Sequence, residues 1–83
     1  MTAEEFVLFD KIITRESNWN PLAQNPNSTA FGTGQFLNST WAYVGCEKTA
    51  DPYTQIDCTR AYILKRYGSY ENAWDFWTEN KFY

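Results

Sequence analysis

The sequence predicts an all-α fold: a single domain over residues 1–83, with about four helices, a long ordered loop after the first helix and little or no strand. Two observations carry this prediction. Apolar residues recur at helical spacing in separate stretches, and each stretch is bounded by residues that start or stop helices. No stretch alternates Val, Ile or Thr with polar residues, as a half-buried strand would. At 83 residues the chain is long enough for one small domain.

The first helix is expected to run from Thr2 or Ala3 to Glu16. Thr2 followed three residues later by Glu5 is a capping-box pattern, in which each side chain bonds the backbone N–H of the other residue. The apolar face of this helix is supplied by Phe6, Phe9, Ile12 and Ile13.

Glu16, at the end of this helix, is a carboxylate on an apolar face. It follows Ile13, Ile12 and Phe9 by three, four and seven positions, which is the spacing of one helical side. Burial and the outward carbonyls of a helix C-terminus both disfavour negative charge, so both raise the pKa of the carboxyl group. A raised pKa is what a general acid near neutral pH requires. The alternative is a glutamate at a frayed helix end that turns to water.

A long loop should follow, because Pro21 and the polar run 24–29 exclude regular structure. Loops of this length in a small domain are usually functional or disordered. Trp19, Leu22 and Phe31 provide apolar anchors along it, so we expect an ordered loop.

The loop ends in a glycine-containing turn, Phe31-Gly32-Thr33-Gly34-Gln35-Phe36. Its two glycines permit positive φ and allow a ligand to approach the backbone closely. The turn is not a dinucleotide or phosphate loop, because no strand precedes it and the third glycine and the lysine are absent. The alternative interpretation is a tight turn that only leads into the next helix.

A short second helix is expected after this turn. Asn38 or Ser39 is its predicted cap, and the helix should end at Val44. Gly45 supplies the stop, because glycine readily adopts the left-handed conformation that ends helices.

Two further helices are predicted in the last third of the chain. Asp51 followed by Pro52 is a strong start signal for the third helix, and Gly68 ends it. Ser69 then caps a last helix that runs from Tyr70 to about residue 79.

Cys46 and Cys58 are the only two cysteines. An even pair in a small chain fits a disulfide, which would contribute about 2–3 kcal/mol and tie the connection after the second helix to the third helix. A small core gains most from such a bridge, and a disulfide would place the protein outside a reducing cytosol. Two buried free thiols are the alternative.

The composition argues against several classes of function. A net charge of −3 without a basic run disfavours nucleic-acid binding. The absence of His excludes histidine-based triads and most zinc sites, so we expect no metal and no cofactor. No apolar run reaches the ~20 residues of a membrane span, and acidic residues interrupt the N-terminus where a signal peptide would be apolar. The aromatic residues, 19% of the chain, supply a core and also suit a groove that stacks on sugar rings.

A set of short motifs occurs along the chain in a fixed order. They are Glu16-Ser17, Trp19-Asn20-Pro21, Ala30-Phe31-Gly32-Thr33-Gly34-Gln35-Phe36, Ser39-Thr40-Trp41, Asp51-Pro52-Tyr53-Thr54-Gln55-Ile56, Tyr62-Ile63, Arg66-Tyr67-Gly68-Ser69 and Ala73-Trp74. In this order they resemble the lysozyme-like superfamily and, within it, the soluble lytic transglycosylase (SLT-like) domain, including forms from phage virions and secreted actinobacterial proteins. The resemblance covers most of the chain and implies a small lysozyme-like fold.

Carried over residue by residue, the resemblance implies that Glu16 is the catalytic acid. The family's Gly-x-x-Gln motif falls on Gly32 and Gln35, and this glutamine contacts the sugar next to the scissile bond. The family's Tyr beside the acid, part of a Tyr-Asn-Ala-Gly motif, falls on Trp74, where the hydroxyl is missing. With two further aromatic residues of the matching motifs, the candidate substrate-binding residues are Gly32, Gln35, Phe36, Tyr62 and Trp74.

Glycosidic cleavage normally takes two carboxylates, but only Glu16 stands in the family's catalytic context. Asp51, Asp57 and Glu47 are interpreted as a helix cap, a helix-surface residue and a residue of a connection. A single acid suits the route that the resemblance implies. Glu16 would protonate the β-1,4 bond between N-acetylmuramic acid and N-acetylglucosamine, and then act as base on the muramic acid 6-hydroxyl to give a 1,6-anhydro product.

Two alternatives stay open at this point. Attack by water in place of the 6-hydroxyl would make the protein a hydrolytic lysozyme, such as a phage endolysin. A non-catalytic wall-binding or virion structural module would retain the fold without the activity. In each case the expected partner is the glycan strand of peptidoglycan, met by a monomer on the extracellular or cell-wall side, as a phage lysin, a virion-associated protein or a secreted protein.

Overall fold

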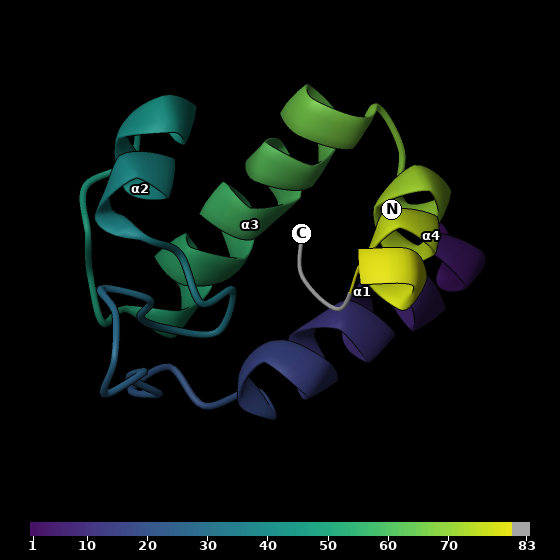
Figure 1. Ribbon diagram of the computed structural model, residues 1–83. Coiled ribbons are helices and arrows are strands. Elements are labelled where there is room, and N and C mark those ends of the chain that lie inside the picture. The colour runs from purple at the N-terminus through teal and green to yellow at the C-terminus, as the bar shows by residue number, and fades with distance from the viewer. Residues whose placement is uncertain (81–83) are drawn as a thin grey trace.

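A computed structural model of the chain describes residues 1–80, and within them it contains four helices and no β-strand beyond isolated bridges (Figure 1). The helices are α1 (Ala3–Ser17), α2 (Asn38–Val44), α3 (Pro52–Tyr67) and α4 (Tyr70–Asn80). The all-α prediction is therefore confirmed. None of these helices is long and apolar enough to cross a bilayer.

The helix ends follow the predicted signals with one exception. The Thr2 capping box is present, and Asp51 accepts a hydrogen bond from the backbone N–H of the third residue of α3. Gly45 and Gly68 end α2 and α3 with positive φ. The predicted cap of α2 at Asn38 or Ser39 is wrong: Leu37 holds the cap position, in extended conformation and without a side-chain bond.

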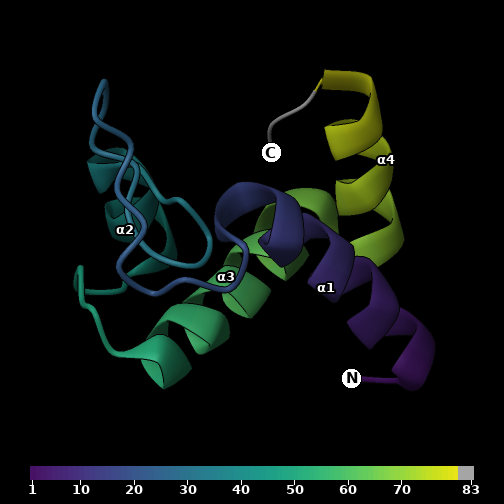
Figure 2. The same ribbon diagram turned by 90° about the horizontal axis from the view of Figure 1, so that it is seen from below.

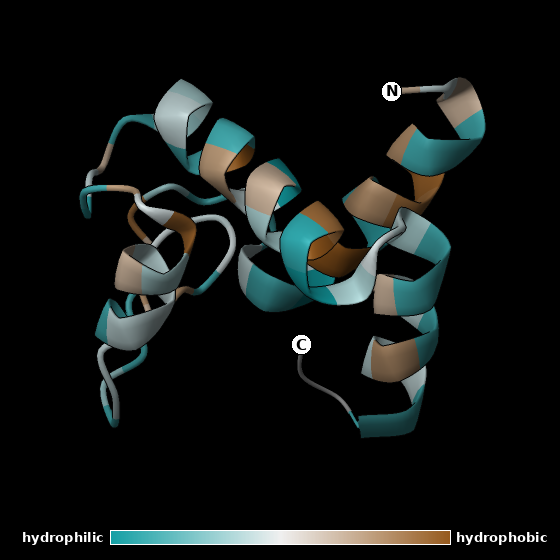
Figure 3. Ribbon diagram, turned by 90° about the horizontal axis from the view of Figure 1, so that it is seen from above, coloured by the Kyte–Doolittle hydropathy of each residue, from teal (hydrophilic) through white to brown (hydrophobic). Residues whose placement is uncertain are grey.

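Helix α3 lies between the two halves of the molecule. α2 and the long loop lie on one side of it, and α1 and α4 lie on the other (Figure 2). Hydrophobic residues gather on the middle turns of α1 and α3, whereas the outer faces of the helices are hydrophilic (Figure 3). The buried cluster consists of Phe9, Ile12, Ile13, Phe36, Trp41, Cys58, Tyr62, Ile63, Tyr70 and Ala73.

Gln55 of α3 holds the long loop against the helices. Its side chain is only 1% exposed. Its Nε2 donates to the carbonyl oxygens of Pro21 (2.9 Å) and Thr49 (2.7 Å), and its Oε1 accepts from the backbone N–H of Thr33 (3.0 Å). Because one side chain satisfies three separate stretches of backbone, the loop is ordered, as predicted.

A disulfide joins Cys46 to Cys58, as favoured from the sequence. Cys46 follows the end of α2, and Cys58 lies in the first half of α3. The bridge therefore fixes the connection between these two helices, on the same side of the molecule as the long loop.

Candidate functional site

Glu16 lies one residue before the end of α1, with its carboxyl group half-buried. Ile12 and Ile13 of the same face are completely buried, so the helical spacing has brought the acid to the edge of the core. Burial raises the pKa of Glu16. A hydrogen bond of 2.8 Å from the Trp77 indole Nε1–H to Oε1 acts in the opposite direction, but burial is the larger effect.

The backbone after Glu16 is fixed by two features. The hydroxyl of Ser17 donates to the carbonyl oxygen of Thr33 (2.7 Å), which ties the end of α1 to the glycine turn. Asn18 and Trp19 then have φ of 52° and 61°, in the left-handed region that non-glycine residues rarely adopt. The acid is thus followed at once by a backbone reversal that the neighbouring turn holds in place.

Trp19 anchors this reversal on the outer side of α1. Its ring packs against Phe6 and Phe9, with centroid separations of 6.3 and 6.1 Å. Its indole N–H donates to a carboxylate oxygen of Asp10 (2.7 Å). Trp19 therefore serves as an anchor of the loop, as its sequence position predicted.

Gly32 is the point where the turn and α3 meet most closely. Its φ is 87°, and a Cβ atom built there would lie 2.7 Å from the Gln55 amide nitrogen. Only glycine fits, both for its backbone angle and for this contact. The group that approaches the Gly32 backbone is therefore the side chain of Gln55, in the position that sequence reasoning assigned to a ligand.

Gln35 is held by two backbone carbonyls. Its Nε2 donates to the carbonyl oxygens of Ala23 and Gly32, both at 2.9 Å. A side-chain amide has two N–H donors, so both are used here and the group has only its Oε1 to offer a substrate. The backbone of Gln35 has φ 52°, a rare conformation for a residue with a side chain. Gln35 is therefore a fixed hydrogen-bond acceptor.

Phe36 and Tyr62 lie deeper than their assignment as sugar contacts implied. They are 3% and 4% exposed, and their rings pack on one another at 5.2 Å. Both line a hollow of about 210 Å³ that Gln35 also borders. Phe36 and Tyr62 therefore line the hollow and at the same time belong to the buried cluster.

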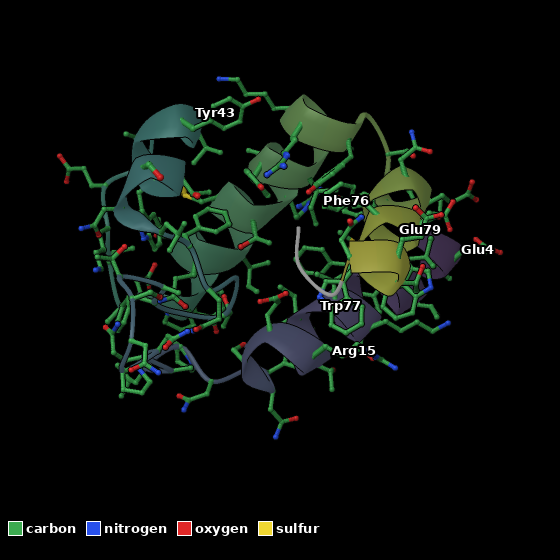
Figure 4. All side chains as sticks on the ribbon, viewed as in Figure 1. Glu4, Arg15, Tyr43, Phe76, Trp77 and Glu79 are labelled. Atoms are coloured by element: carbon green, nitrogen blue, oxygen red, sulfur yellow. A yellow bond between two sulfur atoms is a disulfide. The ribbon has the colours of Figure 1, made fainter. Side chains whose placement is uncertain are left out.

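The ring beside the acid is Trp77, one helical turn beyond Trp74. Trp74 stacks on Trp77 with centroids 5.7 Å apart and planes 5° from parallel. The Arg15 guanidinium lies 4.8 Å from the Trp74 ring and 5.7 Å from the Trp77 ring (Figure 4). The structure thus places Trp74 in a stack of rings and cations against α1, while Trp77 makes the hydrogen bond to Glu16.

Tyr67, at the end of α3, belongs to the electrostatic surroundings of the acid. Burial is the main cause that raises its pKa, and the neighbouring Tyr62 and the charge of Glu16 raise the pKa further. The phenol of Tyr67 therefore lies within electrostatic reach of Glu16.

Sequence reasoning missed Trp77 and Gln55 as site residues. Trp77 lies three positions after Trp74, so both rings occupy one face of α4 and spacing alone does not distinguish them. Gln55 carried a signal that was available: it lies three positions before Cys58 and seven before Tyr62, on the inner side of α3, where a polar residue requires a partner.

These observations define a class of protein: a small all-α domain whose half-buried glutamate ends the first helix beside a glycine turn. The family model described as Transglycosylase SLT domain matches residues 2–78, and the chain belongs to this family. Membership supports peptidoglycan lytic transglycosylase-type activity in general and implies peptidoglycan as the substrate. Comparisons with curated proteins and with solved structures gave no significant match.

Proposed function

We propose that this protein cleaves the β-1,4 bond between N-acetylmuramic acid and N-acetylglucosamine, with Glu16 as the acid and then the base, and releases 1,6-anhydro products. The observation that carries the proposal is the state of the Glu16 carboxyl group. It is half-buried, its pKa is raised by burial, and one of its oxygens is already held by Trp77. A carboxyl group in this state suits proton donation near neutral pH.

Trp77 helps to decide where the proton of Glu16 sits. An indole N–H only donates, so the carboxyl oxygen that accepts from it must present a lone pair. Since the carbonyl oxygen of a carboxylic acid is a better acceptor than its hydroxyl oxygen, this bond favours the acidic proton on the other oxygen, which faces the glycosidic oxygen in the proposed reaction. Once the proton has left, the same N–H stabilises the carboxylate, which is the form needed for the second step.

The proposed reaction balances with one carboxyl group. Glu16 gives its proton to the glycosidic oxygen as the bond from that oxygen to the muramic C1 breaks, and the substrate's acetamido group supports the cation that develops at C1. The Glu16 carboxylate then takes the proton of the muramic 6-hydroxyl while the oxygen of that hydroxyl bonds to C1. The enzyme returns to its starting protonation state, and no water is consumed.

The surroundings of the other carboxylates support a single-acid route. Asp51 is occupied by Thr54 at the start of α3, and Asp10 accepts from Thr14 and Trp19 on α1. Among the described residues, no second carboxylate shifts the pKa of Glu16. A two-carboxylate mechanism would require a partner close to the scissile bond.

Gln35 supports substrate positioning in this proposal. Its only available group is Oε1, an acceptor, so it suits an N–H or O–H of the sugar next to the scissile bond. The strained backbone at Gln35 is consistent with a site that holds one geometry for binding.

Mass spectrometry of digested peptidoglycan tests the reaction type. We expect disaccharide products lighter by one water than the hydrolytic ones, which identifies the 1,6-anhydro ring. Products with a reducing end would make the protein a lysozyme with the same acid. Binding to purified sacculi without released fragments would leave only a wall-binding module and overturn the proposal.

The proposal also includes the place of action. Peptidoglycan lies outside the cytoplasmic membrane, and a disulfide such as Cys46–Cys58 is stable in oxidising surroundings. We therefore propose that the protein works on the extracellular or cell-wall side.

A further inference from the structure

A second hollow continues from the one that Gln35 borders. It has a volume of about 360 Å³, in the range of small-molecule sites. Three residues line both hollows: Thr40 of α2 and Tyr62 and Arg66 of α3. The two hollows are therefore neighbours, and together we call them the groove between α2, α3 and the glycine turn. We call the second hollow the distal pocket.

The lining of the distal pocket differs from the lining near Gln35. Besides the three shared residues, it is lined by Ser39 and Tyr43 of α2, which carry hydroxyl groups. Tyr43 is 46% exposed and lies beside α2, away from α4 (Figure 4). A half-exposed ring can stack on a sugar, and the hydroxyl groups beside it can form hydrogen bonds. This lining therefore suits a sugar-linked ligand.

Arg66 is the only charged residue among the described residues that line the groove. Its guanidinium is held by aromatic rings, with centroid distances of 5.2 Å to Tyr67, 5.6 Å to Phe76 and 5.9 Å to Tyr62. Its Nη1 donates to the Tyr62 hydroxyl at 2.5 Å. The cation is therefore oriented before any ligand arrives, so little of its freedom remains to be lost on binding.

The chemistry of Arg66 points to an anion. A guanidinium has five N–H donors, and one is used by Tyr62, so donors remain for a planar, two-oxygen partner. A neutral sugar does not require a cation, and the chain as a whole carries a net charge of −3. A fixed positive charge in the groove of an acidic protein is therefore selective for ligands that carry negative charge.

We propose that the distal pocket is a subsite for a carboxylate carried by the glycan strand, with Arg66 as its specificity-determining residue. This inference rests on the proposed function, because it uses the same groove and the same polymer. Peptidoglycan offers the carboxylate from two sources: the lactyl group of muramic acid where the stem peptide has been removed, and the acidic residues of the stem where it is present. Chitin-type oligosaccharides offer none.

The experiment measures binding in a Glu16→Gln background, so that no ligand is cleaved. Three probes are titrated by calorimetry: chitotetraose, a peptide-free tetrasaccharide of alternating N-acetylglucosamine and N-acetylmuramic acid, and the same tetrasaccharide with its stem peptides. Adding Arg66→Gln should weaken binding of at least one carboxylate-bearing probe by roughly tenfold or more, since a charge-assisted hydrogen bond is lost. Binding of chitotetraose should change by no more than about twofold. The probe that loses affinity identifies the source of the carboxylate.

Two further variants serve as controls. Arg60→Gln makes the same change elsewhere on α3, at a residue that bonds Tyr70 and does not line the groove, and should leave the selectivity unchanged. Arg66→Lys keeps the charge but loses the planar fork, and should recover part of the lost affinity. Thermal unfolding of each variant shows that the fold is intact.

The outcomes separate this inference from the proposed function. Equal losses for neutral and carboxylate-bearing probes, or equal effects of Arg66→Gln and Arg60→Gln, would overturn the carboxylate subsite while leaving glycan binding intact. If the Glu16→Gln protein with Arg66 present bound none of the three probes, the groove would not be a glycan site, and both proposals would fall.

Discussion

The two halves of the candidate site are built by different means. In the helical half, formed by α1 and α4, the Glu16 carboxyl group accepts one side-chain hydrogen bond within residues 1–80, from Trp77, which is 61 residues away in the chain. In the loop half, formed by residues 18–37, the glycine turn is held by many backbone bonds and by Gln55. Few hydrogen bonds of the described residues therefore hold the reactive group of the helical half, whereas many hold the loop half.

Because the two halves are held differently, substitutions in them should affect different properties. A change at Glu16 or Trp77 in the helical half removes the proton donor or shifts its pKa without opening the core, so activity and its pH dependence should respond. A change in the loop half leaves buried backbone groups without partners, so stability should respond.

The largest effect is expected from Glu16→Gln, which is nearly isosteric and cannot donate an acidic proton. We expect peptidoglycan cleavage to fall by about 10²–10⁴-fold, the range of general acid–base catalysis, with no loss of stability. Release of soluble fragments from sacculi measures activity, and circular dichroism measures the fold. Glu4→Gln, an exposed change at the other end of α1, is the matched control and should keep full activity. Full activity of Glu16→Gln would remove Glu16 from the mechanism.

Gln55→Ala should cause the largest loss of stability in the loop half. It leaves the N–H of Thr33 and the carbonyls of Pro21 and Thr49 without their partner, and we expect a loss of about 2–4 kcal/mol in the free energy of unfolding. Chemical unfolding measures this value, and the melting temperature should fall by roughly 10 °C or more.

Gln24→Ala is the matched control for this prediction. Gln24 likewise bonds three backbone groups, the carbonyls of Asn25, Ser28 and Ala30, but it is exposed, so water replaces the lost bonds. Its cost should stay below about 1 kcal/mol. Equal losses for the two variants would mean that Gln55 is not what holds the loop.

Trp77→Phe should change the pH dependence of activity. The indole N–H lowers the pKa of Glu16 against the effect of burial, so its removal raises that pKa further. Glu16 must be protonated to start the reaction, and the alkaline limb of the activity profile should therefore move to higher pH, by about one unit or less. Trp74→Phe changes a ring in the same stack that does not bond the acid, and should leave the limb in place. An unmoved limb in Trp77→Phe would contradict the assigned role of the N–H.

The smallest effect concerns stability as a function of pH. The pKa of Glu16 is raised above its ordinary value of 4.5, so between these two values the folded state binds more protons than the unfolded state. The free energy of unfolding should therefore fall as pH rises from 4.5 through the folded-state pKa of Glu16. At higher pH, Glu16 should cause no further decrease. Glu16→Gln lacks this decrease. Urea unfolding of both proteins from about pH 4 to about pH 8 checks the difference, and parallel profiles would contradict it.

Much of the fold was predictable because its signals are local. The capping box at Thr2, the Asp51-Pro52 start of α3 and the stops at Gly45 and Gly68 act within one helical turn, and all lie where the sequence predicts. The missed cap of α2 has a local reason as well. Leu37 already has the extended backbone of a cap, so α2 begins one residue earlier than a side-chain cap would allow.

By itself the sequence determined the order of the helices, their ends and the apolar face on which Glu16 lies, because these depend on spacing and on nearest neighbours. Tertiary structure alone decided which groups meet. Trp74 and Trp77 share one face of α4, and the position of α4 along α1 brings the second of them to Glu16. In the same way, the packing of α3 on the loop and on α2 places Gln55 under Gly32 and Arg66 in the groove. The side of a helix on which a residue lies depends on that helix alone. The residue that it contacts depends on how two helices are placed against each other.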